Sequence, residues 1–113
     1  MSDNIFGEVK KGMRTPWGTA DCVRQLAPGI WNVSTPSHGG IKLSKERLAK
    51  MPKSMRKAWY EEDCDWALVY AVFGDDILAH CTPETFEMER RNLGRVKSTI
   101  EHWNPQIAKE FYV

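Results

Sequence analysis

Three turn signals divide residues 15–43 into short segments. Each signal combines proline with glycine: Thr15-Pro16-Trp17-Gly18, Ala27-Pro28-Gly29 and Pro36-Ser37-His38-Gly39-Gly40. Proline fixes one backbone torsion and cannot donate to a sheet ladder, while glycine permits the torsions of tight turns. The clearest segment between turns, 30–35, carries the β-forming residues Ile30, Trp31 and Val33. We therefore predict a small antiparallel three-stranded sheet over about 19–43.

The chain after this sheet is expected to be helical. Ser44 is a good N-cap for a helix that ends at Lys50, and residues 53–60 can continue helically after Pro52. A further helix is predicted from Cys64 to Phe73, with Asp63 as its N-cap and Gly74 as its end.

A last long helix is predicted to begin at Thr82-Pro83-Glu84, which combines a cap, an N1 proline and a first-turn acid. Asn104-Pro105 should end it. Its apolar residues recur at helical spacing and predict one buried stripe: Phe86, Leu93, Val96, Ile100 and Trp103. The expected fold is α+β, with three or more helices over about 44–113 packed on the sheet.

A chain of 113 residues has the usual size of one domain. The polar residues 1–14 are expected to form a flexible N-terminal arm, and 15–113 a single globular domain. The start of the chain lacks an apolar run, so we expect neither a signal peptide nor a membrane span. Cys22, Cys64 and Cys81 form no CxxC pair, which argues against a zinc site or disulfides and favours the cytoplasm.

The net charge of +1 conceals separate blocks of charge. Residues 42–57 contain seven basic residues and one acid, whereas 58–89 contain nine acids and no Lys or Arg. Such blocks call for a structural or functional explanation.

Three motifs together resemble a domain of unknown function found in proteins of bacterial phages and plasmids. These motifs cover about residues 15–77: Thr15-Pro16-Trp17-Gly18, then Ala27-Pro28-Gly29-Ile30 through Ser34-Thr35-Pro36-Ser37-His38-Gly39-Gly40 to Leu43-Ser44-x-x-Arg47, and Tyr60-Glu61-Glu62-Asp63-Cys64-Asp65-Trp66-Ala67. The resemblance implies a bacterial mobile element and, for a short gene of this kind, an accessory protein that acts against host defence. It implies no catalytic residue and no cofactor.

The loop Ser37-His38-Gly39-Gly40 is a candidate ligand-binding site. Two glycines allow positive φ and a close approach of the backbone, so that exposed N–H groups can hold an anion. His38 can donate a hydrogen bond or transfer a proton. The plainer interpretation is a hairpin turn with a solvent-facing histidine. The adjacency of His38 makes Ser37 a poor candidate for a nucleophile.

The acidic stretch that begins at Glu61 is a candidate protein-interaction surface. Its acids could instead bind a hard cation or supply a general acid or base, and the plainer interpretation is that they complement a helix dipole. The surface comprises Glu61, Glu62, Asp63, Asp65, Asp75 and Asp76.

A basic segment offers a third candidate site, for nucleic acid. Its cations could follow a phosphate backbone, but a solvated helix face is the favoured interpretation, because the net charge is low. The residues concerned are Lys45, Arg47, Lys50, Lys53 and Arg56.

The function that the sequence favours is binding of a host bacterial protein, such as a nucleic-acid-handling defence factor, through the acidic surface. Two alternatives stay open. One is a small-ligand-binding protein or metal-assisted hydrolase that combines the Ser37–Gly40 loop with Glu62, Asp63 and Asp65. The other is a nucleic-acid-binding module that uses Lys45–Lys57. The sequence does not indicate an oligomeric state.

Overall fold

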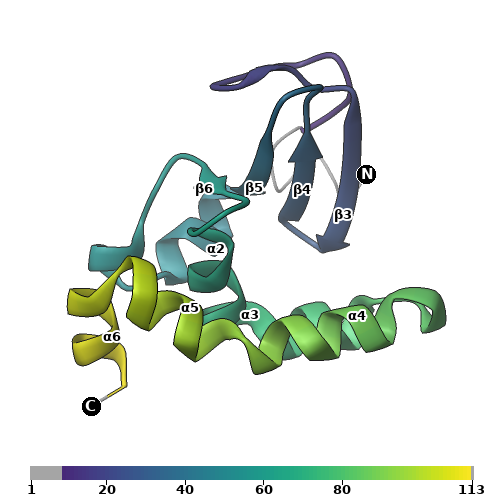
Figure 1. Ribbon diagram of the computed structural model, residues 1–113. Coiled ribbons are helices and arrows are strands. Elements are labelled where there is room, and N and C mark those ends of the chain that lie inside the picture. The colour runs from purple at the N-terminus through teal and green to yellow at the C-terminus, as the bar shows by residue number, and fades with distance from the viewer. Residues whose placement is uncertain (1–8, 113) are drawn as a thin grey trace.

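The computed structural model describes residues 9–112, and it is an α+β fold with two antiparallel sheets and five α-helices (Figure 1). The predicted flexible arm of residues 1–14 lies mostly outside the described residues. The strands are β1 Arg14–Thr15, β2 Gly18–Thr19, β3 Cys22–Ala27, β4 Ile30–Ser34, β5 Gly39–Leu43 and β6 Tyr60–Glu61. The helices are α2 Lys45–Lys50, the 3-10 turn η1 Lys53–Met55, α3 Trp66–His80, α4 Pro83–Gly94, α5 Val96–Trp103 and α6 Pro105–Phe111.

The main sheet has four strands in the order β3-β4-β5-β6, so the predicted three-stranded sheet lacked one strand. The missing strand is β6, which falls at the end of the segment for which a helix was predicted. That segment makes only the short turn η1 and then runs extended, which allows both Met55 and Tyr60 to be buried. The Tyr60 hydroxyl donates to the Met55 carbonyl at 2.6 Å and accepts from the Lys57 N–H at 3.1 Å. Burial of a large side chain with a satisfied hydroxyl outweighs the local helix preference.

The two faces of the sheet pack against different partners. Ile30 and Ile41 belong to the main core, which they share with residues of α3 and α5. Trp31 and Val33, which alternate with Ile30 along β4, form a second, smaller cluster with Ala20. Val9 and Met13 of the N-terminal segment pack against this cluster. Successive side chains of β4 therefore pack into two different cores, instead of one face packing inward and the other facing solvent.

The helices form a layer beneath the strands, in which α3 packs against α4 and α5 (Figure 1). The predicted end of α3 at Gly74 is wrong, because the helix continues to His80. Gly74 is buried, and a Cβ on it would collide with the Leu93 side chain. A helix-interior glycine here serves the close packing of α3 on α4, which its weak helix propensity does not reveal.

The single long helix predicted from residue 82 is in fact two helices, α4 and α5, separated at Arg95. Its start is confirmed, because Thr82 as the N-cap and Thr85 at the third helical position form a capping box, with Pro83 as the first helical residue. The predicted stripe is only partly buried: Val96 and Ile100 lie in the core, whereas Phe86 and Trp103 are exposed. Within the described residues, no helix has both the length and the apolar character to cross a membrane.

Candidate functional site

Strand β6 brings the acidic stretch beside the His38 loop. Glu61 pairs with Gly40 across the β5–β6 ladder, and the Glu62 N–H donates to the Gly39 carbonyl at 3.0 Å. Two segments that lie more than twenty residues apart in the sequence are thereby fixed next to each other. The ligand-binding alternative required His38 and an acid to converge in a concave pocket; the structure brings the side chains together, and their meeting depends on the strand that the sequence did not predict.

Three carboxylates surround the imidazole of His38. Nε2 lies 2.7 Å from Glu61 Oε2 and 3.9 Å from Asp63 Oδ2, while Nδ1 lies 3.3 Å from Glu62 Oε2. The ring is largely shielded, with 22% of its side chain exposed, whereas 67% of the Asp63 side chain is exposed. The cluster is therefore a partly open surface site with a well-covered imidazole at its base.

The hydrogen-bonding capacity of the ring and of the carboxylates limits what this cluster can hold. Ionised carboxylate oxygens only accept hydrogen bonds, and a neutral imidazole has a single N–H to donate. Both ring nitrogens of His38 face carboxylate oxygens, so in a neutral ring one lone pair would point at another. Either a second proton on the ring or a metal ion at Nε2 removes that repulsion.

The loop that carries His38 is held rigidly by its neighbours. The Thr35 hydroxyl donates to the His38 carbonyl at 2.8 Å and accepts from the His38 N–H at 3.1 Å. Trp17, in the β1–β2 turn, packs edge-on against both the His38 ring and Trp59, with ring centroids 5.6 and 5.5 Å away. The exposed Ser37 hydroxyl donates to the Trp17 carbonyl at 3.5 Å. Sequence reasoning identified the loop but not Trp17, which stands more than twenty residues before it.

Gly39 and Gly40 do not have the positive φ that was predicted for them. Among the described residues, positive φ occurs at Gly12, Gly18 and Gly29. Gly39 and Gly40 lie within β5, and their backbone pairs with Ser34 and Val33 of β4. The positive-φ turn that was expected to hold an anion is therefore not formed by these two glycines. Instead, the absence of a side chain at Gly40 lets β5 approach Trp17 and the backbone of β6 closely, and its absence at Gly39 lets β5 approach the backbone of β4.

The six acids of the candidate interaction surface differ in their surroundings. Asp65 is buried and pairs with Lys57 at 3.4 Å, and its carboxylate also accepts from the Glu61 N–H at 3.3 Å. Asp76 pairs with Arg47 at 2.6 Å. Asp65, rather than the predicted Asp63, is the N-cap of α3, which begins at Trp66. Glu61, Glu62 and Asp63 gather at His38, whereas the exposed Asp75 borders a different cavity, beside Lys97 of α5.

The basic segment is likewise divided between internal and exposed side chains. Arg47 also donates to the Pro28 carbonyl and stacks over Phe73, and Arg56 donates to the carbonyls of Met51 and Ala49. These contacts commit the partly buried Arg47 to internal partners, whereas Arg56 stays exposed while it donates to the two carbonyls. Lys45, Lys50 and Lys53 of the predicted set lie exposed at the surface.

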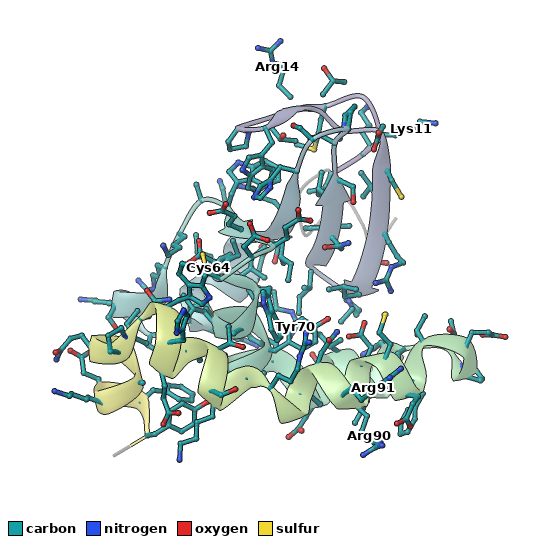
Figure 2. All side chains as sticks on the ribbon, viewed as in Figure 1. Lys11, Arg14, Cys64, Tyr70, Arg90 and Arg91 are labelled. Atoms are coloured by element: carbon teal, nitrogen blue, oxygen red, sulfur yellow. The ribbon has the colours of Figure 1, made fainter. Side chains whose placement is uncertain are left out.

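Cys64 (labelled in Figure 2) lies beside two of the acids, with its Sγ 3.9 Å from Glu61 Oε1 and 3.6 Å from Asp65 Oδ1. Burial, followed by the negative charges of Asp65 and Glu61, raises the pKa of its thiol to about 11. The acids that flank Cys64 in the sequence predict such a rise in the thiol pKa. In two trios, Glu61–Cys64–Asp65 and His38–Glu61–Asp63, the potential ligand atoms lie within 4.8 Å of one another. A protonated thiol is a poor metal ligand, so the trio that contains Cys64 is the weaker metal site.

Comparison with known proteins gives one family. Searches of curated proteins and of solved structures find no match. A family model described as a domain of unknown function, DUF7007, matches residues 10–112, which include β1 to α6 and the whole His38 cluster. The chain therefore belongs to the DUF7007 family of domains of unknown function.

Proposed function

We propose that this domain is a cation-binding module that holds one divalent metal ion with His38, Glu61 and Asp63. The observation that carries the proposal is the placement of one imidazole among three carboxylates. One ligand atom from each of these three residues lies within 4.8 Å of the others. A modest closure of Asp63 would bring them to the spacing of about 3 Å that ligands on one ion adopt.

The electrostatics of the cluster favour a metal ion over a proton alone. Within residues 9–112, the ion pairs formed by Glu61, Glu62 and Asp63 are all with His38, which leaves the cluster with excess negative charge. A divalent cation neutralises more of that charge than an imidazolium does. Mixed imidazole and carboxylate ligands suit Zn²⁺ or Mn²⁺.

Glu62 would have a separate role at this site. Its carboxylate faces Nδ1 at 3.3 Å, on the side of the ring away from Glu61. Ligating histidines commonly donate their second N–H to a carboxylate, which fixes the tautomer and orients the ring. Glu62 therefore positions His38 so that the Nε2 lone pair is directed at the metal.

The setting that fits such a module is a small accessory protein of a bacterial phage or plasmid, working in the cytoplasm of the host. The support is the resemblance of its three motifs to such proteins. A metal ion held by three protein ligands keeps coordination positions open, and the exposure of Asp63 leaves them facing solvent. A partner molecule could complete that coordination.

Titration of the metal-free protein with Mn²⁺ or Zn²⁺ in a calorimeter tests the proposal. We expect one bound ion per chain, and a loss of affinity of at least about tenfold in His38→Ala and in Glu61→Gln. His80→Ala is the matched control, because His80 is exposed and contacts Asp76 at the other end of α3. The control should bind like the wild type. Unchanged affinity in His38→Ala, or equal loss in His80→Ala, would contradict the site.

A second candidate is recognition of a basic surface on a host protein by the carboxylates of Glu61, Glu62 and Asp63. The observation in its favour is that between 42% and 67% of each of these side chains is exposed. We expect a pull-down from bacterial lysate to recover a partner with the wild type and to lose it with Glu62→Lys/Asp63→Lys. Asp75→Lys, on α3, is the control. Adding a chelator separates the candidates, since a partner held by charge alone is retained without metal.

A further inference from the structure

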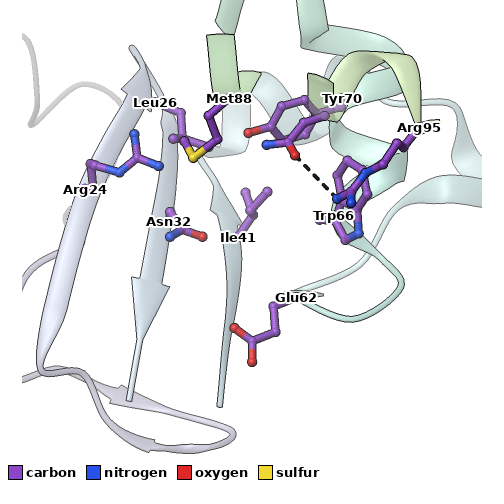
Figure 3. A pocket seen from close by; sticks show the side chains of 10 residues that line it. Arg24, Leu26, Asn32, Ile41, Glu62, Trp66, Tyr70, Met88 and Arg95 are labelled. Carbon is purple, nitrogen blue, oxygen red and sulfur yellow. Dashed lines mark hydrogen bonds between the residues drawn. The ribbon is translucent and has the colours of Figure 1, made fainter. Parts of the chain in front are cut away.

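A cavity of about 220 Å³ lies between the sheet and the helices α3 and α4 (Figure 3). Arg24, Leu26, Asn32 and Ile41 contribute the strand wall. Trp66 and Tyr70 approach from α3, and Met88 and Arg95 from the α4–α5 region, as the close view shows. Asn92 completes the helix wall, and Glu62 lies at the end nearest the His38 cluster. The lining thus combines aromatic and aliphatic surface with two guanidinium groups and two primary amides.

A fully buried carboxylate stands behind the helix wall. Glu89 is 1% exposed, and its Oε1 accepts hydrogen bonds from the Tyr70 hydroxyl at 2.6 Å and the Asn92 amide at 3.2 Å. Its other oxygen, Oε2, has no hydrogen-bond partner among the described residues. Burial and the Glu89 carboxylate raise the pKa of Tyr70, so the hydroxyl stays a donor.

Such a group does not serve core packing. Removing a carboxylate from water is expensive unless it is paired and fully hydrogen-bonded, and an apolar residue of similar size would fill the same space at less cost. The residues that Glu89 contacts are Tyr70, Asn92 and Arg24, and each of them lines the cavity. Glu89 therefore orders one wall of the cavity.

The two arginines retain donors for a ligand. Arg24 Nη1 is 3.9 Å from Glu89 Oε2, which is an ion pair without a hydrogen bond, and 44% of its side chain is exposed. Arg95 stacks over the Trp66 ring at 5.7 Å and approaches the Asn92 amide oxygen at 3.5 Å. A guanidinium group has five N–H donors in a planar fork that matches carboxylate and phosphate oxygens. Within residues 9–112, the contacts just given use only a minority of the donors on each guanidinium group.

We propose that this cavity binds a small organic anion, whose carboxylate or phosphate lies between Arg24 and Arg95. The body of the ligand would rest on Trp66 and Met88, with its polar atoms in reach of the Asn32 and Asn92 amides. The volume limits the ligand to roughly the size of a substituted single ring, below the usual range for drug-sized sites. This binding is independent of the metal proposed at His38.

The test is NMR titration of isotope-labelled protein in the presence of a chelator, which silences the proposed metal site. The probes are benzoate, its neutral analogue benzamide, inorganic phosphate and phenyl phosphate, which all stay within the size limit of a substituted single ring. We expect saturable shifts of the Trp66 indole N–H and of the Asn32 and Asn92 amides with benzoate or phenyl phosphate, and none with benzamide. A comparison of benzoate with phenyl phosphate distinguishes a carboxylate from a phosphate ligand.

Two variants and one control complete the test. Arg24→Gln and Asn32→Ala should each raise the dissociation constant, by about tenfold for the arginine. Arg14→Gln is the matched control, because Arg14 is exposed on β1 and lies far from Tyr70 (Figure 2). If Arg24→Gln proves misfolded, Asn32→Ala carries the comparison. The proposal is overturned by an absence of shifts at these groups, by equal binding of benzamide, or by equal weakening in Arg14→Gln.

Discussion

Replacing Gly40 with alanine is expected to lower the free energy of unfolding by about 3 kcal/mol, because the new Cβ has no room. It would lie 2.5 Å from Trp17 Cη2 and would collide with the Tyr60 carbonyl. The Tyr60 contact is with backbone, which cannot rotate away. Relief requires β6 to separate from β5, and that separation also carries Glu61 away from His38. Urea denaturation followed by tryptophan fluorescence measures the loss.

Gly94→Ala is the matched control for Gly40→Ala. Gly94 ends α4, its φ is not positive, and a Cβ there meets nothing within 4 Å. The same substitution should therefore stabilise the protein, by up to about 0.5–1 kcal/mol, since alanine is the better helix former. If Gly40→Ala unfolds at the same urea concentration as the wild type, the close approach of β5, β6 and Trp17 is not required for the fold.

Ile100→Ala should lower the free energy of unfolding by roughly 2–5 kcal/mol, the usual range for removing a buried aliphatic side chain. Ile100 is completely buried in the main core. Trp103→Ala, one helical turn further along α5, should change stability by only about 0.5 kcal/mol. More than half of the Trp103 side chain is exposed, at 55%.

The comparison of these two variants tests which face of α5 packs into the core. The sequence placed Ile100 and Trp103 on one buried stripe, and by side-chain size alone the tryptophan should matter more. Thermal denaturation of both variants gives the order. A larger loss in Trp103→Ala than in Ile100→Ala would mean that α5 packs with a different face inward.

Much of the local structure could be predicted because short-range rules govern it. The strands between the Pro-Gly turns, the Ser44 cap of α2 and the Thr82-Pro83 start of α4 all form as predicted. Each depends on torsions and hydrogen bonds within a few residues, and the Ser44 side chain does accept from the Arg47 N–H. The signal and its consequence lie in the same short stretch of chain.

The candidate site could be predicted only in its parts. The sequence identified His38 and the acids from Glu61 onward as residues able to do chemistry, but it assigned the preceding segment to a helix. Tertiary burial of Tyr60 and Met55 draws that segment into an extended path instead. The resulting two-residue strand is too short to leave a periodic signal.

The sequence by itself determined the α+β class, the single large helical region after the sheet, and the residue types at the working surface. Tertiary structure alone decided which of those residues meet. It placed Gly40 beneath Trp17, turned Asp65 toward Lys57 and buried Glu89 behind the cavity. The physical reason is that charge pairing and burial act between segments that are distant in the chain. Their energies exceed the local preferences from which a sequence is read.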